Sequence, residues 1–305
     1  MGGVEMVGQS EQMIEEFQLL YNKGWRGSVF IVDDNFIGNK PQVKIMLKQL
    51  IDWQKKHKYP FQFITEASIN LASSKDLMEL MSKANFFKVF LGIETTHLDS
   101  LEGCGKVQNT KVDLSEAVRI IQGYGMQVMG GFIVGFDNDP VTVFESQIKF
   151  IRETGIVTAM VGLLTALPKT PLWHQLKEEN RLLGLTTGEN TDGSLNFIPI
   201  MDKKVLLEGY KYILSQIYSS GAYYKRICIF LKNYKPTVKG NKISKEDVLA
   251  LFRSIWKIGF LSKSRFLYWR LVLKTLLTKT KTFPLVIGLI IQGIHLQKIT
   301  KKVIR

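Results

Sequence analysis

Residues 27–36 read GSVFIVDDNF, in which an apolar, β-branched run of strand length ends in two aspartates, Asp33 and Asp34. Four further apolar runs of similar length follow, at 61–65, 88–93, 128–134 and 159–164. Their starts are spaced by roughly 30 residues, which is the repeat of a strand and its crossover helix in a parallel sheet. Helical patterns occupy the intervals, at 41–56, 74–84, 114–124, 141–153 and 172–180, and another at 11–22 precedes the first run.

The order of these elements predicts an α/β fold of five βα units and a leading helix. A complete eight-stranded barrel is longer, so the pattern indicates a partial parallel barrel or an open parallel sheet that begins with a helix and lacks the strand before it. Loops at the carboxyl ends of parallel strands carry the functional residues of such folds. We therefore expect the site in the segments that directly follow the five apolar runs.

The chain changes character near residue 200. Beyond it the periodicity is helical throughout, with helices predicted at 205–219, 223–232, 245–258, 262–277 and 285–300. Residues 203–305 hold 22 Lys and Arg against Glu208, Glu246 and Asp247, and the whole chain has a net charge of +14. A turn-rich connector at 186–194 lies just before the change. We expect two domains, a partial barrel at 1–200 and an all-helical basic extension at 201–305.

The composition limits the kind of protein that this sequence encodes. Its 305 residues are 45% hydrophobic and 22% charged, as in a folded soluble protein. Two distant cysteines, Cys104 and Cys228, give neither a disulfide framework nor a cysteine-built metal centre, so no metal site is expected. Residues 1–10 lack the features of a secretory signal, and the apolar stretch 283–296 is shorter than the roughly 20 residues of a spanning helix. These features favour the cytoplasm.

Polar residues follow the first three apolar runs. Asp33 and Asp34 can bind an ammonium group, a ribose or a metal, or can cap the next helix. Glu94 can bind the hydroxyl pair of a ribose, or can be a solvated loop acid. Ser68 and Asn70 lie where a site would form, although one of them can equally serve as a cap.

Glycines and prolines mark the last two runs. Gly130 and Gly131 would let a flat ligand approach the backbone, or would mark a β-bulge, and their motif is neither a P-loop nor a dinucleotide fingerprint. Pro168 can form a rigid turn that walls off a base, or an ordinary turn before a helix. Because signals follow all five runs, their agreement predicts a ligand site at that edge of the sheet.

The motifs taken in order resemble those of a known family. VFIVDDNFIGN, FITEASINLA, FLGIETTHLDSL, GGFIVGFDND and LLTALPKTPLW are similar to the successive strand-and-loop motifs of radical S-adenosylmethionine enzymes. They are most similar to the cobalamin-binding subfamily with a helical C-terminal extension, which includes hopanoid methylases. The resemblance covers about residues 9–305. It implies a partial parallel barrel of the radical S-adenosylmethionine type that lacks its first strand, followed by the helical extension.

The resemblance implies S-adenosylmethionine as a cofactor, and eight positions match the segments that contact it. The acidic pair is expected to meet the amino group of the cofactor, and the glutamate after the third run its ribose or methionyl part. The serine and asparagine would add polar contacts, the glycines a backbone ledge, and the proline turn a wall for adenine. These positions are Asp33, Asp34, Ser68, Asn70, Glu94, Gly130, Gly131 and Pro168.

The sequence departs from the family at the iron-sulfur cluster. Enzymes of this kind hold a 4Fe-4S cluster through Cys-x-x-x-Cys-x-x-Cys, because three thiolates leave one iron open to the cofactor. This chain has no such motif. Cluster and cobalamin are expected in the complete enzyme, with their ligands absent here. We expect a C-terminal fragment of a radical methylase or related enzyme that is inactive alone and has no assigned catalytic residue. The alternative is a non-catalytic module that binds S-adenosylmethionine or a membrane.

Basic and apolar residues alternate in the predicted helix at 262–277, which includes Lys263, Arg265, Phe266, Arg270 and Lys274. This mixture suits an anionic lipid surface, so we expect peripheral membrane contact through residues 203–305 at the inner face. The resemblance adds a small-molecule or lipid substrate. A core-packed helix with a solvated basic face is the alternative. Nucleic acid is not favoured, because no recognised motif accompanies the charge.

Overall fold

A computed structural model of the chain describes residues 7–103, 105–186, 194–240 and 244–304. Cys104 and most of the expected connector at 186–194 lie outside the described residues. The chain divides into two compact units, each of which is described by itself. Unit 1 comprises Met1–Leu91, Glu116–Met129 and Leu231–Phe252, and unit 2 comprises Gly92–Ser115, Gly130–Phe230 and Arg253–Arg305. The domain boundary near residue 200 stays a prediction.

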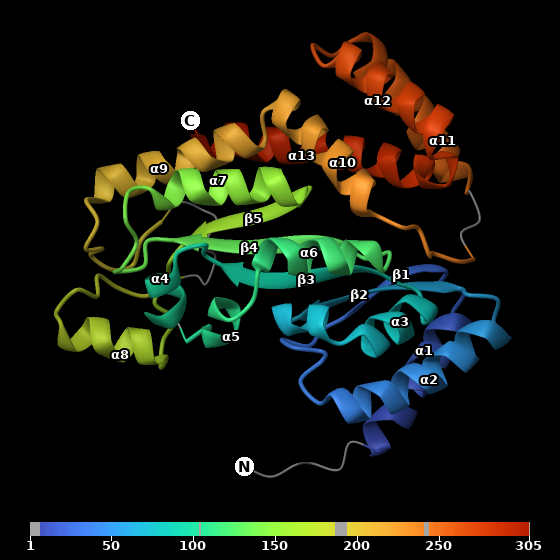
Figure 1. Cartoon of the computed structure of the whole chain (residues 1–305), viewed down its shortest axis with the longest axis horizontal. Helices are drawn as coiled ribbons and strands as arrows, with labels where there is room; N and C mark the ends of the chain where they lie inside the picture. Colours follow the sequence, from blue (N-terminus) through green and yellow to red (C-terminus); the bar gives the residue numbers. More distant parts are fainter. Residues whose placement is uncertain (1–6, 104, 187–193, 241–243, 305) are drawn as a thin grey trace. The chain divides into compact units, whose positions relative to one another are not determined.

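Five strands form one sheet whose spatial order follows the chain (Figure 1). The strands are β1 (Gly27–Ile31), β2 (Phe61–Ala67), β3 (Phe86–Glu94), β4 (Gln127–Val134) and β5 (Thr158–Leu163). β1 pairs with β2, and β2 with β3, in parallel. Every strand end lies within two residues of its predicted position. The sequence-based prediction of a partial parallel α/β barrel is confirmed.

Helices precede and connect the strands. The long ones are α1 (Val7–Asn22), α2 (Lys40–Lys56), α3 (Lys75–Lys83), α6 (Leu114–Gly123) and α7 (Val143–Thr154). Their ends follow local rules: the side chain of Asn39 accepts a hydrogen bond from the backbone of Gln42 at the start of α2, and Gly155 ends α7 with a φ of +70°. Three short helical segments were not predicted, namely η1 (Ile69–Ser73), α4 (Leu98–Gly103) and α5 (Val107–Thr110).

The elements that the structure describes after β5 are helical, as predicted, apart from a single β-bridge between Leu182 and Phe197. They are α8 (Pro171–Glu178), α9 (Lys203–Ile217), α10 (Ser220–Asn233), α11 (Lys245–Ser254), the π-helix η2 (Ile255–Phe260), α12 (Arg265–Thr278), the 3-10 turn η3 (Thr280–Thr282) and α13 (Phe283–Ile304). Within unit 2, α9 packs against α7 and β5, and α13 packs against α9 and α12 (Figure 1). The predicted helix at 245–258 differs from the structure, because it changes to π geometry at Ile255.

Unit 1 has an aromatic core on one face of its strands. Alternate residues of β2 are fully buried, whereas Gln62, Ile64 and Glu66 between them are half-buried. The ring of Phe63 lies on the buried side, 5.0 Å from that of Phe17 and 5.3 Å from that of Phe86 between centroids. One face of β2 is therefore buried in the core, and its other face stays partly accessible.

Unit 2 is held together by close helix packing and a buried arginine. Gly209 of α9 lies against the ring of Phe144 of α7, so close that a Cβ would overlap the ring. The guanidinium of Arg226 is fully buried, donates to the carbonyls of Ile217 and Val157, and lies over tyrosine rings. Burial lowers the pKa of Arg226 to about 10. These contacts fix the helical layer on β5.

The last helix is longer than the apolar stretch 283–296 indicates. The helical segment Thr280–Ile304 has 25 residues and a mean hydropathy of 1.3 in its most apolar window, which is long and apolar enough to cross a membrane by length and composition. A third of that window is buried inside the protein, and the carbonyl of Leu289 accepts a hydrogen bond from Tyr223 of α10. Core helices of soluble proteins reach the same length and composition.

Candidate functional site

Carboxylates gather at the ends of β1 and β2 in unit 1. Asp33 and Asp34 follow β1 and are exposed, and Glu66 lies near the end of β2. Burial raises the pKa of Glu66, and the negative charges of Asp34 and Asp33 raise it further. The charges of Asp34 and Asp33 thus disfavour the ionised form of Glu66. A cation bound among them would relieve this repulsion.

One of these acids also has a structural role. An oxygen of Asp33 accepts a hydrogen bond from the backbone N–H of Asn35 at 2.8 Å, so the expected alternative of a loop-capping aspartate holds for that oxygen. Asp34 has no such contact among the hydrogen bonds of the described residues. Its carboxylate is therefore the freer of the two.

Asn35 ties the loop after β1 to the loop after β2. Its side-chain oxygen accepts a hydrogen bond from the backbone N–H of Ser68 at 3.0 Å, and the backbone N–H of Phe36 donates to the backbone carbonyl of Glu66. The hydroxyl of Ser68 in turn donates to the side chain of Asn70. These hydrogen bonds link Asp33, Ser68 and Asn70 through Asn35, whereas Asp34 is connected to them only as a neighbour in the chain.

The end of β3, in unit 2, has an unusual backbone. Glu94 has a φ of +65°, which is uncommon for a residue other than glycine. The backbone N–H of Thr95 donates to the carbonyl of Ile93 at 2.9 Å, so Glu94 is the central residue of a three-residue γ-turn. Turns of this hand are rare and strained, and such strain concentrates at functional sites.

Neighbouring residues hold Glu94 in place. Its carboxylate pairs with the ammonium of Lys106 at 3.1 Å, and the side-chain amide of Asn109 donates to the carbonyls of Gly92 and Ile93. A Cβ at Gly92 would lie 2.5 Å from the Glu94 carboxylate, so only glycine leaves room for the observed position. The carboxylate is therefore oriented by this part of unit 2 and is not a freely solvated loop acid.

The loop after β4 is organised by two further acids. The carboxylate of Asp139 is buried and accepts hydrogen bonds from the backbone of Gly135 at 2.9 Å, the backbone of Phe136 at 3.1 Å and the hydroxyl of Ser100 at 2.7 Å. Arg181 binds both oxygens of Asp137 at 2.6 and 2.7 Å. These contacts fix the chain where β4 ends, and Gly135 turns there with a φ of +104°.

The predicted backbone ledge has a packing role. Gly130 and Gly131 are both buried in β4. A Cβ at Gly130 would lie 2.7 Å from the ring of Phe132 and 3.2 Å from the side chain of Ile93. The absence of a side chain at Gly130 therefore serves the fit of two neighbouring side chains, and a ledge for a ligand stays a prediction.

The turn after β5 combines a fixed part and an exposed part. The side chain of Asn196 donates to the carbonyl of Ala166 and accepts from its backbone N–H, at 2.8 and 3.0 Å. Pro168 is exposed beyond this anchor, and Thr170 caps α8 by accepting from Trp173. The ordinary turn before a helix is thus present, and the role of Pro168 beside adenine stays a prediction.

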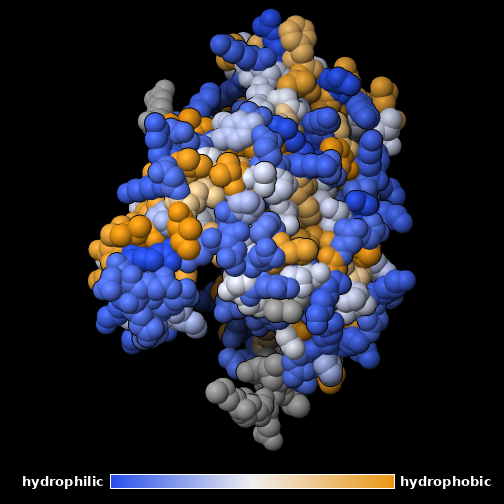
Figure 2. Space-filling view, turned by 60° about the vertical axis from the view of Figure 1, so that its left-hand side comes forward, coloured by the Kyte–Doolittle hydropathy of each residue, from blue (hydrophilic) through white to orange (hydrophobic). Residues whose placement is uncertain are grey.

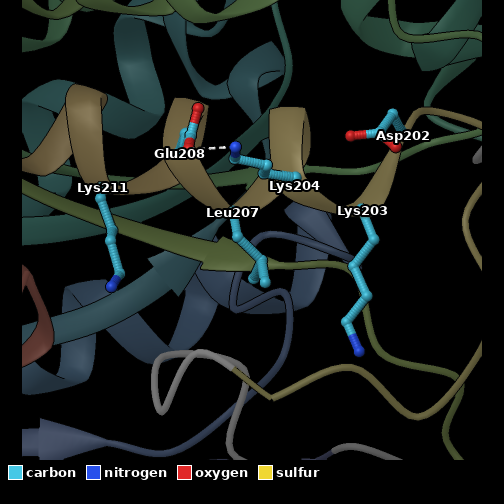
Figure 3. A pocket seen from close by; sticks show the side chains of 6 residues that line it. All are labelled: Asp202, Lys203, Lys204, Leu207, Glu208 and Lys211. Atoms are coloured by element: carbon cyan, nitrogen blue, oxygen red, sulfur yellow. Dashed lines mark ion pairs between the residues drawn. The ribbon is translucent and has the colours of Figure 1, made fainter.

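A shallow hollow of about 430 Å³ lies elsewhere in unit 2, along the first turns of α9. Figure 3 shows Lys203, Leu207 and Lys211 on one side of the helix and the ion pair of Lys204 with Glu208 on the other. The strand ends described above contribute nothing to its lining. Because this hollow has no strained, buried or strongly oriented group, the strand ends are the better candidate site.

Among the described residues, no group of three or more His, Cys, Asp and Glu side chains could hold a metal ion. Cys228 of α10 is a free thiol. A 4Fe-4S cluster takes several thiolates from its protein, and the sequence contains two cysteines in all. The residues of this chain therefore do not fit the cluster.

Comparison with solved structures gives the class of the fold. The chain aligns with a radical S-adenosylmethionine methyltransferase from Kitasatospora setae, solved with cobalamin and a 4Fe-4S cluster bound, at a TM-score of 0.50 and 13% identity. The alignment covers 82% of this chain and 51% of that one. The partial barrel is of the radical S-adenosylmethionine type, as the sequence resemblance implies.

Comparison with curated sequences gives particular relatives. The chain is 42% identical to an uncharacterized methyltransferase of Synechocystis sp., over 85% of this chain and 49% of that protein. It is 33% identical to the hopanoid C-2 methylase of Rhodopseudomonas palustris, over 88% of this chain and 51% of that protein. Residues 170–305 match a domain of unknown function, DUF4070. The resemblance to the C-terminal part of cobalamin-binding radical S-adenosylmethionine enzymes is confirmed, and the chain spans about half the length of these relatives.

Proposed function

We propose that this chain is the barrel and helical part of a cobalamin-dependent radical S-adenosylmethionine enzyme that carries out methylation or related radical chemistry. The names of its relatives and the fold of the Kitasatospora enzyme support the proposal. Within this function, the chain binds and orients S-adenosylmethionine at the carboxyl ends of its strands. The observation that carries the proposal is the strained γ-turn that presents the Glu94 carboxylate.

The acids at the strand ends suit the chemical groups of the cofactor. S-adenosylmethionine has a positive amino group and a ribose with two hydroxyls, and it supplies the methyl group or the radical when it is bound. In the proposal, Asp34 and Asp33 accept hydrogen bonds from the amino group, and the nearby Glu66 gains a positive partner that lowers its pKa. Glu94, held by Lys106, accepts from the ribose hydroxyls or the methionyl part.

The remaining predicted residues keep the roles that the resemblance gives them. In unit 1, Ser68 and Asn70 would supply hydrogen-bonding groups beside the acids. In unit 2, the backbone at Gly131 and the turn at Pro168 would contact the adenine. In this arrangement the protein contributes binding and orientation, whereas the reactive chemistry belongs to the cofactors. Cobalamin and the cluster are not assigned to residues of this chain.

In this proposal the chain alone is inactive in radical chemistry, because its two cysteines cannot supply the three thiolates of the cluster. Cluster and cobalamin would be held by a segment or polypeptide other than these residues. The alternative of a non-catalytic S-adenosylmethionine-binding module makes the same binding prediction. Anaerobic reconstitution with iron and sulfide tests whether the chain is instead an enzyme by itself. Formation of 5′-deoxyadenosine by this chain would contradict both the inactive enzyme part and the non-catalytic module.

The test of the binding claim is isothermal titration of the chain with S-adenosylmethionine. The wild-type chain is expected to bind, and the double variant Asp33→Asn, Asp34→Asn to bind at least about tenfold more weakly, because two charge-assisted hydrogen bonds are lost. Asp52→Asn, an exposed acid of α2, is the matched control and should leave the affinity unchanged. No heat of binding with the wild-type chain, or equal affinity of the double variant, would overturn the proposal.

A lipid substrate and a cytoplasmic location at the inner membrane face complete the proposal. The hopanoid C-2 methylase among the relatives and the basic composition of residues 203–305 support them. Methylation assays of the complete enzyme with lipid extracts, compared with water-soluble extracts, test the substrate class. Methyl transfer to water-soluble material alone would contradict a lipid substrate.

A further inference from the structure

Helix α12 is apolar on two sides, and the protein buries one of them. Tyr268, Leu271 and Val272 face the interior. Phe266 and Leu277, in contrast, are 76% and 84% exposed, although both are large apolar side chains. A surface helix normally has a polar outer face, so an apolar outer face indicates a surface that something else covers.

The exposed apolar residues of α12 share one face with cations. Phe266, Leu273 and Leu277 are spaced by seven and four residues, which places them on the same side of a helix. Arg270 and Lys274 follow Phe266 by four and eight residues, so both lie on or beside this face, and both are exposed. Apolar and positively charged side chains therefore alternate along the outer side of α12.

The preceding π-helix extends this surface. Trp256 and Phe260 are 63% and 54% exposed, and their ring centroids lie 6.1 Å apart. The ring of Phe260 lies 6.0 Å from that of Trp269 in α12, so the two helices form one continuous apolar surface. Figure 2 shows hydrophobic and hydrophilic patches side by side at the upper end of the view, where Figure 1 places α12.

Negative charge is missing from this part of the sequence. No Asp or Glu follows Asp247, whereas three exposed cations lie here: Lys257 within η2, Lys263 between η2 and α12, and Arg265 at the start of α12. Uncompensated positive charge attracts an anionic partner. Exposed leucine and phenylalanine side chains favour a partner with an apolar interior, which an anionic lipid layer has and a nucleic acid backbone lacks.

We propose that η2 and α12 form a docking surface for an anionic lipid bilayer. Phe266, Leu273 and Leu277 enter the boundary between headgroups and acyl chains, and Arg270 and Lys274 meet lipid phosphates. Trp256 lies at the rim of the surface, where aromatic side chains are favoured. This inference does not depend on S-adenosylmethionine binding or on methyl transfer, and each can fail without the other.

Flotation of the 305-residue chain with vesicles tests the proposal. Vesicles of phosphatidylcholine with 30% phosphatidylglycerol should carry the chain upward, and vesicles of phosphatidylcholine alone should carry much less. High salt should weaken the binding, because it screens the attraction. Equal binding to both vesicles, no binding to either, or salt-sensitive retention on RNA without vesicle binding would overturn the proposal.

Variants separate the two contributions. Arg270→Gln with Lys274→Gln should lower partitioning by about 25-fold, since each cation near such a surface contributes about fivefold. The matched control, Lys48→Gln with Lys149→Gln, removes two exposed lysines of α2 and α7 and should leave partitioning almost unchanged. Phe266→Ser with Leu277→Ser should abolish flotation while the chain remains folded, because both side chains are exposed. Unchanged flotation of either α12 variant would contradict the proposal.

A fluorescence measurement gives an independent readout. Tryptophan emission should shift to shorter wavelength when anionic vesicles are added, because Trp256 leaves water. Trp256→Phe should remove the shift, whereas Trp25→Phe, which replaces another half-exposed tryptophan, should keep it. A shift that depends on Trp25 instead would place the membrane contact outside η2 and α12 and would contradict the proposal.

Discussion

The ammonium of Lys106 lies 3.1 Å from the carboxylate of Glu94, and both groups sit over the bare backbone of Gly92. Lys106 and Gly92, which lie in the same segment of unit 2 as Glu94, thus define the position of its carboxylate. Glu94 itself occupies a strained γ-turn, and Asn109 bonds the carbonyls on its N-terminal side. An acid needed only for solubility would require none of these constraints.

Gly92→Ala tests this relationship. The new methyl group would displace the Glu94 carboxylate from Lys106, because the methyl carbon and a carboxylate oxygen would otherwise lie 2.5 Å apart. We expect about tenfold weaker binding of S-adenosylmethionine, equivalent to about 1.4 kcal/mol, measured by isothermal titration. Gly123→Ala is the control, since a Cβ there meets nothing within 4 Å. Equal affinities for the two variants would contradict the role of Glu94.

Asp139 should be a strong determinant of stability. Asp139→Ala leaves the buried N–H groups of Gly135 and Phe136 and the hydroxyl of Ser100 without their acceptor, at a cost of about 2–3 kcal/mol. Asp139→Asn keeps an oxygen at the site and should cost less than about 1 kcal/mol. Chemical denaturation measures both values. A loss as small for alanine as for asparagine would show that the loop after β4 does not depend on these bonds.

The same residue predicts a pH dependence. Burial raises the pKa of Asp139, although its hydrogen bonds and His97 oppose this. A raised pKa means that the folded protein holds the proton more tightly, so the contribution of Asp139 is greatest in acid and is lost as the pH rises through its folded-state pKa. The Tm of the wild type relative to Asp139→Asn should therefore fall as the pH rises from the ordinary pKa of an aspartate through the higher pKa of the folded state. A constant difference would contradict the raised pKa.

Ionised Glu66 should lower the stability of the folded protein while it strengthens binding of S-adenosylmethionine. Its pKa is raised by burial and by Asp34 and Asp33, so its ionised form destabilises the folded protein at neutral pH. Glu66→Gln should raise the Tm slightly at pH 7 and have no such effect at pH 4, where the side chain is protonated, and it should weaken binding of S-adenosylmethionine. Glu79→Gln on the surface of α3 is the control. A lower Tm for Glu66→Gln at pH 7 would contradict the repulsion among the three acids.

The pair of Arg181 and Asp137 should hold the loop after β4 against the segment after α8. Arg181→Ala removes two short hydrogen bonds to one carboxylate and should cost about 2 kcal/mol. Arg181→Lys keeps the charge without the planar fork and should recover about half of that. Thermal unfolding and a double-mutant cycle with Asp137→Asn measure the coupling. Additive effects of the two single changes would contradict a direct pair.

Most of the fold follows from sequence periodicity, and most of the site's supporting contacts do not. The five apolar runs and their spacing predict all strands to within two residues, because burial on a sheet leaves a clear pattern. The short helices α4 and α5 leave no such pattern. The π-helix η2 arises where the carbonyl of Gly259 accepts from the indole of Trp269, which is a tertiary contact that periodicity cannot reveal.

The candidate acids are visible in the sequence, but their partners are not. Asp33, Asp34 and Glu94 directly follow apolar strands, and parallel strands end at one edge of the sheet. Asn35 is adjacent to the acidic pair, yet only its contact with Ser68 reveals its role. Lys106 lies twelve residues beyond Glu94 with no periodic relation to it. The conformation of the loops decides which residues of this kind meet, and a single sequence does not show that conformation in any simple pattern.

Hydrogen exchange of the chain with and without S-adenosylmethionine tests the central claim most directly, because it locates the binding site along the sequence. The account predicts slower exchange in the segments after the strands, at residues 33–39, 66–73, 94–97, 135–139 and 166–170, and no change along the first turns of α9 or in α12. Protection confined to the hollow along α9, or no protection at any strand end at saturating cofactor, would contradict it.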